Sequence, residues 1–249
     1  MYLHEPIYDL DILAKQNLHL HTIFSGCAKP GMTIKNILDT VGETDLKIIA
    51  LTDHFNDNIT SEDYLEHIRF MRAELAKEDF DFTVLVGAEL SAYAPGKSLE
   101  NDAVRDALDY KLFSCNHYHL DYWGQPENKT LRGYVEYSCA TLRSLIVSGK
   151  ADCIAHPFIG RFVHAFDDKT LITKEMTDLE LGSLLELSNI HEVAWELNTG
   201  AILGDPDFGR RLWNLGREVG AVFNYGTDGH RLTDIDTQRL LPEVKKALL

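Results

Sequence analysis

The chain has 249 residues, of which 45% are hydrophobic and 25% are charged. These are ordinary globular values, so they exclude a wholly disordered, collagenous or coiled-coil chain. The formal net charge of −15 argues against broad binding of nucleic acid or of an anionic membrane, because neutralising phosphates requires clustered lysine and arginine.

Seven short apolar runs follow one another along the chain. Each is long enough for a strand and rich in β-branched or large apolar residues. They span residues 17–21, 47–52, 83–90, 111–115, 152–155, 192–197 and 221–225. No linker or low-complexity segment separates them, so we expect one domain over residues 1–249.

Signals for helix starts lie between these runs. Two capping-box spacings and one N-cap followed by proline are found at Thr60 and Asp63, Thr177 and Glu180, and Asp205 and Pro206. Short strands that alternate with helices predict βαβ units and a parallel sheet. Seven such units predict an α/β fold closed into a TIM-like barrel, with an open doubly wound sheet as the alternative.

The cysteines and the N-terminus bear on localisation. Cys27, Cys115, Cys139 and Cys153 form no CxxC pair and no dense framework, which fits a reducing cytosol. No basic n-region with an apolar h-region opens the chain, and no stretch reaches ~18 apolar residues. We therefore expect a cytoplasmic protein without a signal peptide or membrane span.

The residues that follow the apolar runs carry the chemistry. In a parallel barrel all carboxyl ends of the strands open on one face, and residues i and i+2 of a strand point the same way. One HxH pair alone is more often a surface or core pair, but six of the seven runs lead into a histidine or acid. Imidazole with carboxylate suits Zn, Mn or Fe. The candidate ligands are His19, His21, His54, Glu89, His117, His156, Asp228 and His230.

The order HxH, TDH, GxE, H, AHP, DxH, from His19 to His230, resembles the PHP (polymerase and histidinol phosphatase) family. The resemblance implies a distorted (β/α)7 barrel with two or three divalent ions and the hydrolysis of phosphoesters. It implies that Glu89 bridges two ions and that His117 and His156 bind the second ion. The HxH, TDH and DxH motifs supply the other ligands.

The sequence leaves two alternative roles for each of two residues near these motifs. The family often places a further His or Asp a few residues after HxH, and here Cys27 stands at that place. A thiolate is a good zinc ligand, but a buried structural cysteine is an equal alternative. His119 is either a substrate contact or a plain loop histidine.

The motifs predict hydrolysis of a small phosphomonoester by a metal-activated hydroxide. No GxSxG motif or Walker loop supplies another mechanism. Arg161 and Arg231 are the candidate phosphate-binding residues, with Lys29 as a weaker third; the alternative for each arginine is a surface ion pair. The long segment 118–133 either covers the substrate or is packed down by its aromatic residues.

Three other functions compete with this one. An amidohydrolase-like C–N or C–O hydrolase also uses HxH and a late Asp, but it usually bridges its metals with a modified lysine where this chain has Glu89. A nuclease is disfavoured by the charge of −15. A non-catalytic PHP module that acts as a structural partner is expected to have lost ligands, whereas eight are present.

Overall fold

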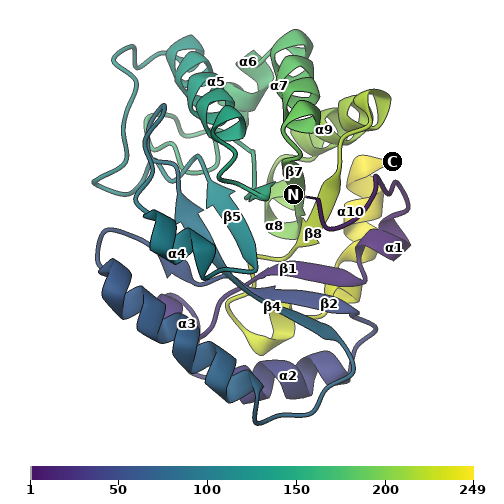
Figure 1. The fold of residues 1–249 in the computed structure, drawn as a ribbon. Helices are drawn as coiled ribbons and strands as arrows, with labels where there is room; N and C mark the ends of the chain where they lie inside the picture. Colours follow the sequence, from purple (N-terminus) through teal and green to yellow (C-terminus); the bar gives the residue numbers. More distant parts are fainter. Residues whose placement is uncertain (1) are drawn as a thin grey trace.

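The structure, a computed structural model, describes residues 2–249. It contains a nearly closed barrel of parallel strands in the order β1-β2-β4-β5-β6-β7-β8 (Figure 1). These strands are β1 (Gln16–Leu20), β2 (Ile48–Leu51), β4 (Thr83–Ser91), β5 (Tyr110–Ser114), β6 (Cys153–Ile154), β7 (Ala194–Asn198) and β8 (Phe223–Gly226). Each predicted run contributes one of them, so the distorted TIM-like (β/α)7 barrel is confirmed. A further short strand, β3 (His54–Phe55), pairs with β4.

The seam between β1 and β8 closes the barrel. Leu20 and Gly229 form a parallel bridge, and Gly229 exchanges backbone hydrogen bonds with the residues on either side of Leu20. Its N–H donates to the His19 carbonyl (3.0 Å), and its carbonyl accepts from the His21 N–H (2.9 Å). The HxH motif at 19–21 and the DxH motif at 228–230, near opposite ends of the sequence, therefore lie side by side.

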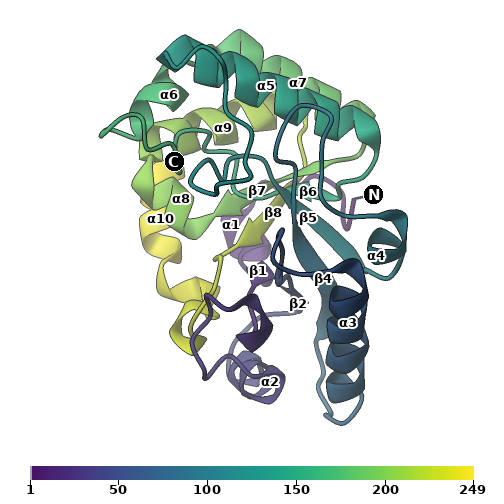
Figure 2. The ribbon, with the colours of Figure 1, turned by 90° about the vertical axis from the view of Figure 1, so that its left-hand side faces the viewer.

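Helices surround the barrel. In both Figure 1 and Figure 2, α5, α6, α7 and α9 lie on one side of the sheet and α2 and α3 lie on the other. The α-helices are α1 (Leu10–Leu13), α2 (Ile34–Gly42), α3 (Ser61–Leu75), α4 (Asp102–Asp106), α5 (Leu131–Ser148), α6 (Thr170–Glu175), α7 (Asp178–Ile190), α8 (Thr199–Gly204), α9 (Pro206–Val219) and α10 (Leu241–Leu248). Three 3-10 helices are η1 (Ile23–Ser25), η2 (Leu232–Asp234) and η3 (Thr237–Arg239).

The predicted helix starts are all used. Thr60 caps α3 and Asp205 caps α9, which begins with Pro206. Thr177 and Glu180 form a complete capping box at the start of α7. Such caps satisfy amide groups that have no partner inside the helix.

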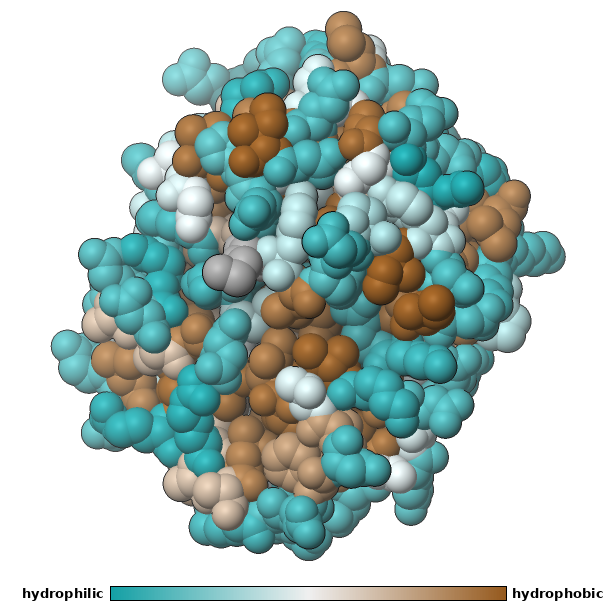
Figure 3. Space-filling view, turned by 45° about the vertical axis from the view of Figure 1, so that its right-hand side comes forward, coloured by the Kyte–Doolittle hydropathy of each residue, from teal (hydrophilic) through white to brown (hydrophobic). Residues whose placement is uncertain are grey.

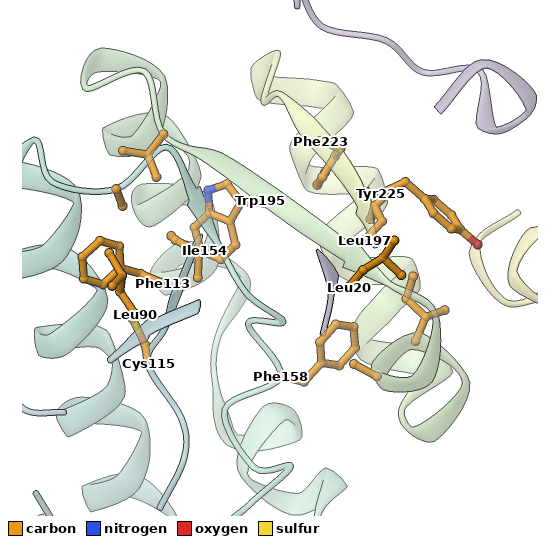
Figure 4. Close-up of a cluster of buried hydrophobic side chains, with 14 of the residues drawn as sticks. Leu20, Leu90, Phe113, Cys115, Ile154, Phe158, Trp195, Leu197, Phe223 and Tyr225 are labelled. Carbon is orange, nitrogen blue, oxygen red and sulfur yellow. The ribbon is translucent and has the colours of Figure 1, made fainter. Parts of the chain in front are cut away.

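The strands place alternate side chains inside and outside the barrel. Figure 4 shows the outer layer that packs against the helices, including Phe113 of β5 and Trp195 of β7. The inner layer includes Tyr110 and Leu112. Glu89 of β4 follows the inward positions, which is why a carboxylate reaches the interior of the barrel. A register shift in β1 between Asn17 and Leu20 adds one residue opposite β2, as in a β-bulge.

Most of the face shown in Figure 3 is hydrophilic, and its hydrophobic residues gather near the middle. None of the helices within residues 2–249 combines the length and apolar character needed to cross a membrane. All four cysteines are free thiols, two of them buried.

Candidate metal centre

The structure brings all eight predicted ligands together at the carboxyl ends of the strands. Their side chains form three groups, and within each group one ligand atom per residue lies within 4.8 Å of the others. The groups are His19, His21, Glu89 and Asp228; then Glu89, His117 and His156; and then His21, Cys27, His54 and His230. Glu89 belongs to two groups, as a bridging carboxylate would.

Glu89 is the centre of the arrangement and is only 1% exposed. Its Oε2 lies 3.0 Å from Nδ1 of His54 and 3.3 Å from Nε2 of His19. Its Oε1 lies 3.0 Å from Nε2 of His156 and 3.4 Å from Nε2 of His117. Among the described residues Oε1 has no partner with hydrogen-bond geometry. Two imidazole nitrogens thus approach a buried oxygen without the geometry of a hydrogen bond, which is the disposition expected of ligands around a cation.

The imidazole of His19 is oriented by Glu196, which lies in the middle of β7. Oε1 of Glu196 lies 2.8 Å from Nδ1 of His19, and both side chains are buried. Asn198 donates to the same oxygen at 3.1 Å. This pair directs Nε2 of His19 toward the centre. Gly226 permits the close packing, because an added Cβ would lie 2.3 Å from Oε1 of Glu196.

Asp53, from the TDH motif, orients the second histidine of the HxH motif. It accepts hydrogen bonds from the Thr22 N–H (2.7 Å), the Thr22 hydroxyl (2.6 Å) and the Ser25 hydroxyl (2.6 Å). Oγ of Ser25 lies 3.0 Å from Nδ1 of His21. Because the single Ser25 proton is given to Asp53, the serine oxygen accepts from Nδ1–H of His21. Nε2 of His21 then carries the lone pair that a metal ion needs.

The backbone is unusual at two candidate ligands. His156 and Asp228 have φ values of 51° and 56°, in a region that non-glycine residues rarely adopt. Nδ1 of His230 lies 2.7 Å from the carbonyl of Asp228. The strained backbone at Asp228 therefore also fixes the orientation of the His230 imidazole. Strain of this kind persists where the surroundings hold it, and it gathers at functional sites.

The charges at the centre favour cations. Burial alone would raise the pKa of Glu89, but His54, His117 and His19 hold it well below its ordinary value. Asp228 behaves likewise: burial opposes ionisation, yet the neighbouring His19 holds the pKa of the carboxyl well below its usual range. Burial lowers the pKa of His21 to about 3, with a further contribution from His54. The ionised carboxylates and the neutral His21 have the protonation states of metal ligands. Burial would lower the pKa of His54, but Glu89 raises it to about 10, so an ion that binds His54 displaces a proton.

Cys27 joins the centre, which the sequence left open. Its Sγ lies 3.1 Å from Nε2 of His230. Burial raises the pKa of the Cys27 thiol, but hydrogen bonds with His230 and His54 outweigh this and lower it to about 7.

A cavity of about 450 Å³ opens onto these residues. It is lined by Ser25, Cys27, His54, Asn56, Glu89, His117, His119, Leu120, Arg161, Phe162, Thr227, Asp228 and His230. Arg161 therefore lies at the site, whereas Arg231 and Lys29 are exposed and do not line it. His119 borders the cavity, although its role as a substrate contact stays a prediction.

Arg161 is held in a defined orientation. Its Nη2 lies 3.3 Å from Oδ2 of Asp228, its Nη1 lies 3.3 Å from Oδ1 of Asn198, and its guanidinium lies 4.9 Å from the ring centre of Phe162. The side chain is 28% exposed, so part of its donor fork faces the solvent. Such a fork suits an anion with several oxygens.

The loop 118–133 is packed down at its aromatic part. Trp123 is 3% exposed, and its ring centre lies 5.4 Å from that of His117. The next residue, Gly124, donates its N–H to the Tyr93 carbonyl at 2.8 Å. Tyr122 donates to Oδ1 of Asn56 at 3.0 Å. Packing thus accounts for the aromatic residues, while the start of the loop borders the cavity.

Sequence reasoning missed the residues behind the ligands. Asp53 stands in the TDH motif and Glu196 is the last but one residue of the sixth apolar run, so the position of each could have pointed to the site. Ser25, Asn56 and Phe162 had none, because serine, asparagine and phenylalanine are common in loops.

Neither protein-family models nor curated proteins match the chain. The resemblance to the PHP family therefore stays a prediction from the motifs. The geometry itself shows a buried histidine and carboxylate cluster able to hold metal ions and compatible with a metal-dependent hydrolase.

Proposed function

We propose that the chain is a metal-dependent phosphoesterase of the PHP type that hydrolyses a small phosphomonoester with two or three divalent ions of zinc, manganese or iron. The observation that carries the proposal is Oε1 of Glu89. A buried carboxylate oxygen without a hydrogen bond is costly unless a cation satisfies it. The nearest atoms are Nε2 of His156 and Nε2 of His117, and both nitrogens are typical ligands of such ions.

Bound divalent ions would supply a water of near-neutral pKa and would neutralise charge on the phosphoryl oxygens. The chain's own residues have other tasks. Arg161 orients an anionic substrate, because Asp228 and Asn198 hold its guanidinium at the cavity wall. Ser25 is not a free nucleophile, since its hydroxyl donates to Asp53. Solvent is therefore the more available nucleophile of the two.

The competing functions find less support. No lysine is among the residues that line the described cavity, and the bridging position is taken by Glu89 rather than by a modified lysine. This disfavours the amidohydrolase-like hydrolase. A non-catalytic module has no need for eight converging ligands or for strained backbone at two of them. The charge of −15 disfavours a nuclease.

Elemental analysis and phosphate release test the proposal together. The purified chain should contain Zn, Mn or Fe, and it should release phosphate from members of a panel of small phosphomonoesters after metal supplementation. His21→Ala and Asp228→Ala should abolish both metal retention and phosphate release. His191→Ala, at the end of α7, is the matched control and should retain both. A folded chain that binds none of the three metals and releases no phosphate would refute the proposal.

A further inference from the structure

The third ligand group differs from the other two because it contains sulfur. Cys27 is exposed at the edge of the cavity, whereas Cys115 and Cys153 are buried in the core. Its Sγ lies 3.1 Å from Nε2 of His230, and the ligand atoms of His21 and His54 lie within 4.8 Å of it. Three imidazoles around one accessible thiol form a nitrogen and sulfur donor set.

The chain holds Cys27 in this place by several backbone contacts. Gly26, directly before it, has a φ of 71° and ends η1, a conformation that glycine adopts without strain. Two residues after it, the N–H of Lys29 donates to the carbonyl of His230 at 2.9 Å. Asp53 fixes the other end of the turn through Thr22. These contacts hold the Cys27 thiol next to His230 of the DxH motif.

His21 belongs to two of the three groups, and its contacts assign it to the first of them. Nε2 of His21 lies 3.2 Å from Oδ1 of Asp228, and its Nδ1 is bonded to Ser25. The imidazole therefore serves the first group. Cys27, His54 and His230 are left as three protein ligands, and an open fourth position is typical of catalytic zinc.

We infer that the thiolate of Cys27, together with His54 and His230, binds one divalent ion, and that this position takes zinc in preference to manganese. The inference rests on the proposed metal centre and goes beyond it by assigning a sulfur ligand and a metal preference. Thiolate ligands favour zinc, whereas carboxylate and water suit manganese. The other two groups contain only nitrogen and oxygen ligands.

Cobalt titration tests the sulfur ligand directly. Wild-type protein loaded with Co²⁺ should show a near-ultraviolet thiolate-to-cobalt charge-transfer band, and Cys27→Ser should lose it. Cys139→Ser is the control, because Cys139 lies on α5 and does not line the cavity. It should keep the band. A band that persists in Cys27→Ser, or that is absent from a cobalt-loaded wild type, would overturn the inference.

Metal content separates this inference from the proposed function. After zinc loading and dialysis, Cys27→Ser should retain about one ion per chain fewer than wild type, while Cys27→Asp should regain an ion and shift the preference toward manganese. Bound zinc should also protect Cys27 from iodoacetamide. Wild type that releases phosphate with its other ions, but whose zinc content Cys27→Ser leaves unchanged, refutes only the sulfur ligand. Wild type that binds no ion refutes both proposals.

Discussion

The contact between Glu196 and His19 predicts a specific loss of metal affinity when the carboxylate is changed. Glu196 is 2% exposed, and its Oε1 lies 2.8 Å from Nδ1 of His19. It does not line the cavity, so its role is to position the imidazole and raise its basicity. In Glu196→Gln an oxygen can still accept the hydrogen bond, but the charge is lost. In Glu196→Ala both are lost.

The expected magnitudes follow from outer-sphere carboxylates in metal sites, whose removal costs about 10-fold to 100-fold in affinity. We expect Glu196→Gln to lose about 10-fold in metal affinity, or about 1.4 kcal/mol of binding free energy. Glu196→Ala should lose about 100-fold, or about 2.7 kcal/mol. Competition with a chromophoric chelator measures the zinc affinity. Glu100→Gln is the control, because Glu100 is also buried but pairs with Arg105 and Lys150 away from the cavity. It should leave zinc affinity unchanged. Equal zinc affinity in wild type and folded Glu196→Ala would refute the positioning role.

A pH dependence in the metal-free chain gives a second measurement on the same pair. Burial alone would lower the pKa of His19, but Glu196, Asp228 and Glu89 raise it well above its ordinary value. A raised folded pKa stabilises the fold fully below the unfolded pKa of about 6.5, and this stabilisation is lost as pH rises through the folded value. The difference in unfolding free energy between wild type and Glu196→Gln should therefore be largest in mild acid. A difference that grows with rising pH would contradict the assignment.

Three further predictions concern the rest of the site. Arg161→Lys should lower kcat/KM for a phosphomonoester by about 10-fold or more, mainly through a higher KM. Arg231→Lys is the control and should match wild type. Equal losses in the two variants would contradict the assignment of substrate binding to Arg161 alone. Gly226→Ala should lower the free energy of unfolding by about 1–3 kcal/mol through overpacking, whereas Gly182→Ala, with open space around it, should not destabilise, as chemical denaturation can show. Trp123→Ala should cost about 3–5 kcal/mol of stability; a variant with unchanged stability but altered KM would instead favour a substrate cover.

The fold was predictable where the sequence pattern is local. Short runs of β-branched or large apolar residues identify every barrel strand, because such residues suit a pleated, buried surface. The two-residue strand β3 and the extra residue in β1 were not predictable, since both depend on which neighbour the backbone meets. The ligands were predictable because strand ends converge in any parallel barrel, whatever the details of packing.

The residues behind the ligands show where sequence reasoning stops. Glu196 and Asp53 are acids within or just after a barrel strand, as Glu89 is, and nothing local distinguishes an acid that faces an ion from one that holds a histidine. Arg161 and Arg231 were equal candidates because each closely follows a ligand histidine. The direction of a long side chain is set by packing, and only Arg161 is held at the cavity, by Asp228 and Asn198.

Acidic side chains also outnumber arginine and lysine at the candidate metal centre. Asp53 is stabilised by hydrogen bonds from Thr22 and Ser25, but Glu89 and Asp228 face histidines that balance their charge only when protonated. Arg161 is the one arginine or lysine that lines the described cavity. Divalent cations bound here would balance both carboxylates and release the histidine protons that balance them in the metal-free chain. A chain of net charge −15 can attract an anionic phosphate at this cavity through those ions and through Arg161, so metal removal should abolish turnover and weaken substrate binding.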